Sequence, residues 1–350
     1  MRSSFIGVLL VVAVLSTSAA ATPASKAQTR RTSGPVLALA ADGGRTAFIV
    51  QGRVRECWSV MVWEPARGRI DQLQSAARCE ASDRPNRRGT PTVALAGTRA
   101  AWLQYSGGNT LETIVYSAST TQRSRSLLAW GNAHDGRVGT FARSPAGDGS
   151  LLAFTVEKNC GIDYDPYVCP PGRGERDIVE STIWRVTGGR GFCLNRPREC
   201  SRVATADREL RVLAVDAGRI VARTERGVSV LDAAGRTLHE LDVTPDGAAL
   251  SGNRLAVRTR DAVEVYDLRT DTQSARFEVA KNVKLADLEG DVLVTTAGGA
   301  ATLRRLGRNR MFTFRARGVA LAQIERPGLF LAGARGVTFL PMRDVLRRLG

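Results

Sequence analysis

The sequence repeats a short apolar strand beside a Gly- or Asp-containing turn, and this repetition restricts the fold more than any single motif. Copies of the strand lie at residues 44–49, 98–103, 149–154, 218–222, 253–257, 290–294 and 328–332. A second apolar strand follows each copy, at residues 60–63, 113–116, 182–185, 228–231, 263–266, 301–304 and 337–340. Such self-similarity is typical of architectures in which each unit buries its apolar face against its neighbours.

Each unit contains four short strands. A small-apolar strand precedes the first copy, as at Val36 to Ala40, and a more polar strand follows the second, as at Arg69 to Leu73. Four short strands with strand-period alternation and Gly-rich turns between them predict a β-propeller blade. Seven units over Thr22 to Gly350 average about 47 residues, near the blade periods known for propellers. We expect an all-β fold, a single β-propeller of seven four-stranded blades over residues 35–350.

The way in which the ring closes is left open by the sequence. Residues 22–33 are polar and show no convincing strand that could complete the last blade. The alternative outer strand is Asp344 to Leu349, but its Asp-Val-Leu-Arg-Arg-Leu sequence equally fits a terminal helical turn.

One segment resembles the exported propellers of the WD-repeat-like and TolB-like superfamily. It runs from Leu39 through an Asp-Gly-Gly turn to Phe48, and the next strand ends in Trp63-Glu64. Residues 144–154 with Trp184, and later residues 265–267, repeat the pattern less faithfully. The resemblance covers essentially the whole mature chain and implies a propeller fold. It implies no particular activity, because the Gly-His dipeptide of WD repeats is missing and no Trp-Asp dipeptide is intact.

The N-terminal residues have the features of an export signal. Arg2 provides the positive charge, Phe5 to Leu15 is uninterruptedly apolar, and Ala19-Ala20-Ala21 supplies small residues for cleavage. We expect cleavage after Ala21, which leaves residues 22–34 as a flexible N-terminal segment. An uncleaved anchor is the alternative, but the apolar stretch is shorter than the ~20 residues of a spanning helix. We therefore predict a secreted or periplasmic protein that does not span the membrane.

The cysteines fit an oxidising compartment, where an even number usually forms disulfides. They are Cys57, Cys79, Cys160, Cys169, Cys193 and Cys200. The first two flank a hairpin that turns near residues 66–68, so we expect them to be bonded. The other four have two alternatives. Either Cys160 bonds Cys169 and Cys193 bonds Cys200, or Cys200 bonds Cys160 or Cys169. A zinc site is the weaker interpretation, because the sequence has no CxxC pair and only two histidines.

The chain is strongly basic, with 50 Lys and Arg against 34 Asp and Glu and a formal charge of +16. Arginine carries nearly all of this charge, a bias that GC-rich coding produces without selection for a ligand. The arginines are scattered rather than gathered in one stripe, so we predict no nucleic-acid binding. Electrostatic retention on anionic envelope polymers is a further hypothesis, which a steep weakening at high salt would support.

Insertions indicate which face of the propeller binds a partner. Loops between second and third strands and loops between blades share one face of a propeller, and such loops often carry function. The loop 52–56, the insertion 158–178 and the blade-to-blade loops 76–89 and 130–136 all belong to this face. Our candidate binding residues are Arg84, Arg87, Arg88, Trp130, His134, Asp135, Asp163 and Asp165.

No catalytic constellation is evident. The His134-Asp135 pair has no Gly-x-Ser-x-Gly motif to supply a nucleophile, and two carboxylates in the insertion are too few for a calcium site. The inner strands show no ring of His, Asp or Glu at equivalent positions, with Asp216 and Asp287 as isolated exceptions. This argues against a metal or quinone site in the central channel. We predict no catalytic residue, no metal and no cofactor.

The favoured function is a monomeric, exported, non-catalytic propeller that binds a protein or a cell-envelope polymer. The alternative is a propeller enzyme, a hydrolase or lyase that acts on a sugar, a lactone or a polyanionic polymer. In that enzyme Asp163, Asp165, His134 and Arg88 would supply acid–base or charge-stabilising groups.

Overall fold

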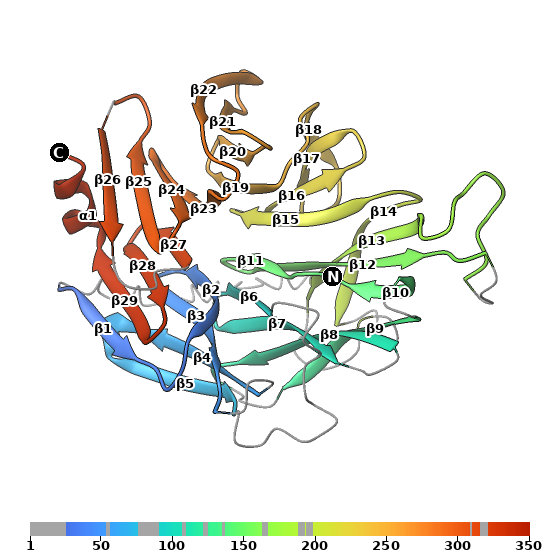
Figure 1. Cartoon of the computed structure of the whole chain (residues 1–350), viewed down its shortest axis with the longest axis horizontal. Helices are drawn as coiled ribbons and strands as arrows, with labels where there is room; N and C mark the ends of the chain where they lie inside the picture. Colours follow the sequence, from blue (N-terminus) through green and yellow to red (C-terminus); the bar gives the residue numbers. More distant parts are fainter. Residues whose placement is uncertain are drawn as a thin grey trace, which may run out of the picture.

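The computed structural model of the chain shows sheets of short antiparallel strands arranged around a common centre (Figure 1). It describes residues 26–53, 57–75, 91–106, 110–121, 125–134, 137–162, 167–187, 193, 199–308, 310–315 and 321–350. The prediction of an all-β propeller with four-stranded blades is confirmed.

Five sheets are separate four-stranded blades. The first contains β2 (Val36–Asp42), β3 (Arg45–Gln51), β4 (Trp58–Glu64) and β5 (Arg69–Gln74), with the 3-10 turn η1 (Pro65–Arg67) between the last two. The next separate blades are β15 (Leu210–Asp216), β16 (Arg219–Thr224), β17 (Gly227–Asp232) and β18 (Thr237–Leu241), and then β19 (Gly247–Ser251), β20 (Arg254–Arg258), β21 (Ala262–Asp267) and β22 (Thr272–Glu278). They are followed by β23 (Lys284–Glu289), β24 (Val292–Ala297), β25 (Ala300–Arg305) and β26 (Arg310–Arg315).

The fifth separate blade closes the ring with both ends of the described chain. It consists of β27 (Leu321–Glu325), β28 (Gly328–Gly333), β29 (Gly336–Pro341) and the N-terminal β1 (Gln28–Arg31). Strand β1 pairs with β29 in an antiparallel register that places Thr29 opposite Thr338. Part of the segment expected to be flexible is therefore the outer strand of this blade. The C-terminal residues form the helix α1 (Met342–Arg348) instead of a strand.

The remaining sheet is larger and has nine strands. In chain order these are β6 (Thr92–Ala96), β7 (Arg99–Ser106), β8 (Thr110–Ser119), β9 (Ser126–His134), β10 (Val138–Ala142), β11 (Ala146–Asp148), β12 (Leu151–Asn159), β13 (Ile178–Val186) and β14 (Cys200–Ala206).

The prediction of seven separate blades is wrong. The described residues form five separate four-stranded blades, and the second and third predicted units are fused into the nine-stranded sheet. The reason is strand β10, which pairs with His134 and Ala133 of β9 on one side and with residues 156–159 of β12 on the other. A strand shared in this way converts two neighbouring units into one continuous sheet.

Neighbouring sheets pack through apolar side chains, with the innermost strands in contact around the centre. The order of these strands is β2, β6, β11, β15, β19, β23, β27 and again β2. Trp102 of β7 illustrates the packing, because its ring is fully buried between the first blade and the nine-stranded sheet. Its indole N–H donates to Oε1 of Gln74 at 3.1 Å, which satisfies the one polar atom that the ring buries. Over the described residues, no helix is long and apolar enough to cross a membrane.

Candidate functional site

The insertion 158–178 leaves the nine-stranded sheet between β12 and β13 and extends away from the ring (Figure 1). The structure describes it at residues 158–162 and 167–178. It connects the second and third strands of its unit, as the sequence predicts. Its position at the end of two long strands places it on the loop face that we expect to bind a partner.

A disulfide and hydrogen bonds connect the described parts of the insertion to one another and to the neighbouring blade. A disulfide joins Cys160 to Cys169, and the backbone N–H of Cys160 donates to the carbonyl of Asp177 at 3.0 Å. The backbone N–H of Arg176 donates to the carbonyl of Cys160 at 2.7 Å. The guanidinium of Arg173 donates to the carbonyl and to Oδ2 of Asp207, both at 2.9 Å. Because Asp207 lies between β14 and β15, this contact fastens the insertion to the neighbouring blade.

The insertion exposes two large apolar side chains. Ile162 is 64% exposed and Val168 is 56% exposed, and Val168 bridges to the backbone of Gly161. The other exposed large apolar residues in the described part of the chain are Leu127, Trp130, Leu238 and Met311. Ile162 and Val168 are therefore the exposed apolar candidates for a contact on the insertion.

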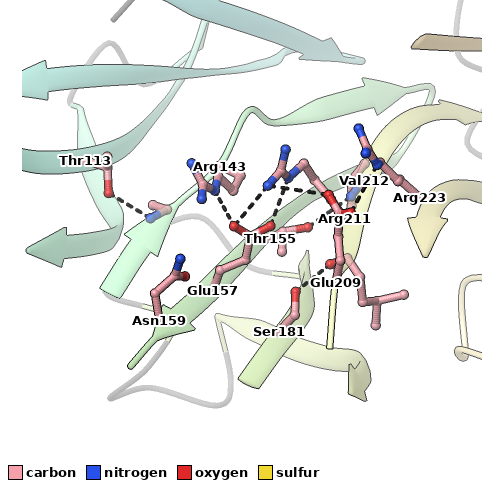
Figure 2. Close-up of polar contacts among 12 residues, drawn as sticks. Thr113, Arg143, Thr155, Glu157, Asn159, Ser181, Glu209, Arg211, Val212 and Arg223 are labelled. Atoms are coloured by element: carbon pink, nitrogen blue, oxygen red, sulfur yellow. Dashed lines mark hydrogen bonds and ion pairs between the residues drawn. The ribbon is translucent and has the colours of Figure 1, made fainter. Parts of the chain in front are cut away.

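A buried ion-pair cluster lies at the root of the insertion (Figure 2). Glu157 of β12 has a side chain with 0% exposure, and its carboxylate accepts from Nε of Arg143. Arg211 of β15 donates to the same carboxylate through Nε at 2.8 Å and through Nη2 at 3.2 Å. Glu209 then contacts Arg211 at 3.6 Å and Arg223 at 3.1 Å. The cluster thus links the nine-stranded sheet with the adjacent blade.

The charges in this cluster compensate one another. Burial alone would lower the pKa of Arg211, but the hydrogen bonds and charge of Glu157, with help from Glu209 and Tyr105, outweigh it and raise that pKa. Burial raises the pKa of the Tyr105 hydroxyl, against the opposing charges of Arg143 and Arg211. The cluster is therefore suited to fixing the strands beneath the insertion, because the carboxylate of Glu157 is shared between two guanidinium groups from different sheets.

Side-chain to backbone hydrogen bonds continue this linkage around the cluster. The hydroxyl of Thr155 accepts from the N–H of Val212 at 3.0 Å, and that of Ser181 donates to the carbonyl of Leu210 at 2.7 Å. The N–H of Ala142 donates to the hydroxyl of Thr113 at 2.7 Å. Buried hydroxyl groups with such partners hold β10, β12, β13 and β15 in register.

Two of the predicted binding residues lie in a strand. The segment that starts at Trp130 is not a blade-to-blade loop, because Trp130 to His134 belongs to β9 and β10 pairs with its end. Trp130 lies opposite Ile114 of β8 and is 42% exposed, and His134 is exposed at the end of β9. The other candidates lie outside the described residues: Arg84, Arg87, Arg88, Asp135, Asp163 and Asp165.

The sequence contained a signal for the buried cluster that our interpretation missed. In β12, residues 151, 153, 155 and 157 share one face of the strand, and all four are buried. A glutamate on a face that otherwise carries Leu, Ala and Thr predicts a buried carboxylate, which needs a cationic partner. The partners themselves come from distant parts of the chain.

Of the cysteine pairings that the sequence leaves open, the two local disulfides form. Cys160 bonds Cys169, and Cys193 bonds Cys200. The backbone N–H of Cys193 also donates to the carbonyl of Leu128 in β9 at 2.8 Å. The expected pair Cys57 and Cys79 cannot be placed in the same way, because Cys79 lies outside the described residues.

Comparison with known proteins supports the fold. No protein-family model matches the sequence, and no curated protein matches it either. A chain in the crystal structure of the Mitotic Checkpoint Complex is similar with a TM-score of 0.53 and 11% identity, over 95% of this chain and 99% of that one. BamB from Moraxella catarrhalis has a TM-score of 0.46 and 9% identity, over 87% and 85% of the two chains. Saccharomyces cerevisiae Sqt1 has a TM-score of 0.46 and 11% identity, over 91% and 99%.

Proposed function

We propose that this β-propeller is an exported, non-catalytic binding protein and that the insertion 158–178 makes the central contact with a protein partner. The observation that carries the proposal is the exposure of Ile162 and Val168 on a cross-linked loop. A few well-buried residues near the centre of an interface supply most of its binding energy. The fixed conformation of the loop lowers the entropy that association must remove.

The surroundings of the two anchors also favour a protein partner. Arg173, Arg176 and Asp177 lie in the same insertion, so it carries charged groups as well as the apolar pair. Interfaces between proteins commonly combine an apolar centre with a polar rim. A purely electrostatic contact with an envelope polymer would not require Ile162 and Val168 to be exposed.

Export is supported by the N-terminal apolar segment together with the two disulfides of the structure. Disulfides persist outside the cytoplasm and are rare within it. We therefore place the binding function in the periplasm or outside the cell, with a protein of the cell envelope as the expected partner.

The test compares capture of proteins from the envelope fraction of the source organism by three immobilised proteins at moderate salt. They are the wild type, an Ile162→Asp/Val168→Asp variant, and the control Leu238→Asp, which alters an exposed apolar residue of β18. We expect one stoichiometric protein to bind the wild type and the control, and to bind the double variant at least about tenfold more weakly. Equal capture by all three, or retention of glycan only at low salt, would refute the proposal.

A further inference from the structure

The central cavity is acidic at one end, although the chain as a whole is basic. The innermost strands enclose a cavity of about 200 Å³. Each of these strands runs into a tight turn at the same end of the cavity, and several end in a carboxylate. These residues are Asp42 of β2, Asp148 of β11, Asp216 of β15, Glu289 of β23 and Glu325 of β27. Our expectation that no acidic residues recur at equivalent positions was wrong, because five of the seven inner strands end in Asp or Glu.

Most of these carboxylates connect one blade to the next. Asp42 accepts from the N–H of Gly97, and Asp148 accepts from the N–H of Ala217 at 2.8 Å. Asp216 accepts from the N–H of Gly252 at 3.0 Å. In each pair the donor lies in the turn that follows the neighbouring inner strand. These contacts explain why an acidic residue stands at the end of the strand, since it satisfies a backbone N–H group across the boundary between blades.

Glu325 is different because it lies where the ring closes. It ends β27, which packs against β2, and the structure shows no hydrogen bond to its carboxyl group from any described residue. Burial raises its pKa to about 10, with further contributions from the negative charges of Asp287, Asp42, Asp148 and Glu289. Burial also raises the pKa of Asp287 to about 7, although this carboxylate accepts from the N–H groups of Ile324 and Leu288.

The arginines near the ring pair with carboxylates other than Glu325. Arg219 pairs with Asp216 at 3.2 Å, and the exposed Arg326 approaches Glu289 at 3.6 Å. Of the strands that pack against β27, β28 and β24 carry no charged residue, and Lys284 lies at the opposite end of β23. Within the described residues, no three His, Cys, Asp or Glu side chains converge closely enough to hold a metal ion. A proton is therefore the simplest means of neutralising Glu325.

We propose that the boundary between β27 and β2 is a pH-sensitive closure controlled by the proton of Glu325, because this carboxyl group lies among acidic strand ends and accepts no hydrogen bond from a described residue. Loss of this proton places another negative charge among Asp42, Asp148, Asp287 and Glu289. Their repulsion then loosens the blade that the two ends of the described chain complete. At this boundary the protonated form of Glu325 favours closure, so the closing blade is loosened as the pH rises.

The direction of the effect follows from proton binding. In the unfolded chain a glutamate releases its proton near its ordinary value, whereas the folded ring retains the proton of Glu325. Between these two values the folded state binds more protons than the unfolded state. The contribution of Glu325 to stability is therefore greatest below about pH 4, decreases as the pH rises through this window, and levels off only near pH 10.

The experiment measures urea unfolding of the mature protein between pH 5 and pH 9 in the presence of a metal chelator. We expect the midpoint of the wild type to fall by on the order of 0.5 M over this range, and that of Glu325→Gln to fall clearly less. The control Glu240→Gln removes an exposed carboxylate of β18 and should behave like the wild type. Equal pH slopes in the wild type and Glu325→Gln would overturn the proposal.

A second measurement needs only the wild-type protein and so does not depend on the folding of a variant. Infrared spectra are recorded at pH 7 and near pH 10.5, with and without carbon-13 in the glutamate side chains. We expect a protonated carboxyl band at pH 7 that shifts with the glutamate label and disappears at the higher pH. A spectrum without such a labelled band at pH 7 would show that Glu325 is ionised in the folded ring, and the proposed closure would be wrong.

Discussion

Glu157 shows what a single buried carboxylate contributes at the scale of a residue. Its two oxygens are shared between Arg143, which follows β10, and Arg211 of β15. The side chains of Arg143 and Arg211 are partly exposed at the edge of the cluster, whereas the side chain of Glu157 is fully buried. A buried ion pair of this kind contributes little net free energy, but the loss of one partner is costly because it leaves the other unpaired.

We therefore expect Glu157→Gln to lower the free energy of unfolding by on the order of 2–4 kcal/mol. The amide has nearly the same shape but leaves two guanidinium groups without a counter-charge. Urea denaturation at neutral pH measures the change. Glu225→Gln is the matched control, because Glu225 pairs with Arg208 at the surface, and a change near the error of measurement is expected there. Similar losses in the two variants would show that Glu157 is not a structural centre.

The insertion 158–178 acts as an element of its own, and its disulfide is the feature that sets its conformation. A Cys160→Ala/Cys169→Ala variant should retain the propeller fold, because the bond lies outside the sheet. We expect protease cleavage between residues 160 and 169 to become at least about tenfold faster, since local opening no longer requires a bond to break. Mass spectrometry of timed digests measures this. Cys193→Ala/Cys200→Ala is the control, and its insertion should be cleaved at the wild-type rate.

The closing strand β1 supports a second prediction at the scale of an element. A chain that begins at residue 33 lacks Gln28 to Arg31 and leaves the edge of β29 unpaired. We expect a lower melting temperature and the appearance of oligomers, because open strand edges pair with other chains. Calorimetry and size-exclusion chromatography measure the two effects. A chain that begins at residue 26 is the control and should remain as stable as the mature protein. Equal behaviour of the two chains would mean that β1 is dispensable.

These elements also show what the sequence can and cannot predict. The inner strands were predicted because their apolar residues and turns are local signals, as in Gly44 to Ile49. Strands β1 and β10 were not, because β1 is four polar residues and β10 is defined by partners on both sides. The position of the insertion and its local disulfide were within the range of sequence reasoning. Glu157 and the acidic strand ends had local signals that our interpretation missed. The pairing of Glu157 with Arg143 and Arg211 was beyond sequence reasoning, because distant strands bring these residues together.

At the scale of the whole molecule, charge is distributed unevenly between the centre and the periphery. The cavity carries carboxylates, whereas outer strands expose arginines, such as Arg30 and Arg31 of β1, Arg276 of β22 and Arg310 of β26. Charged side chains on an open strand edge disfavour pairing with the edge of another copy. This arrangement gives these arginines a role that requires no ligand.

Because of this distribution, the salt dependence of binding distinguishes a contact through the insertion from a contact through the exposed arginines. If Ile162 and Val168 anchor a protein partner, the dissociation constant should change by less than about threefold between 0.05 M and 0.5 M salt, because apolar contacts are not screened. Isothermal titration with the captured partner measures this. An anionic envelope polymer should instead lose most of its affinity over the same range. A steep salt dependence with the protein partner would indicate that exposed arginines, and not the insertion, make the main contact.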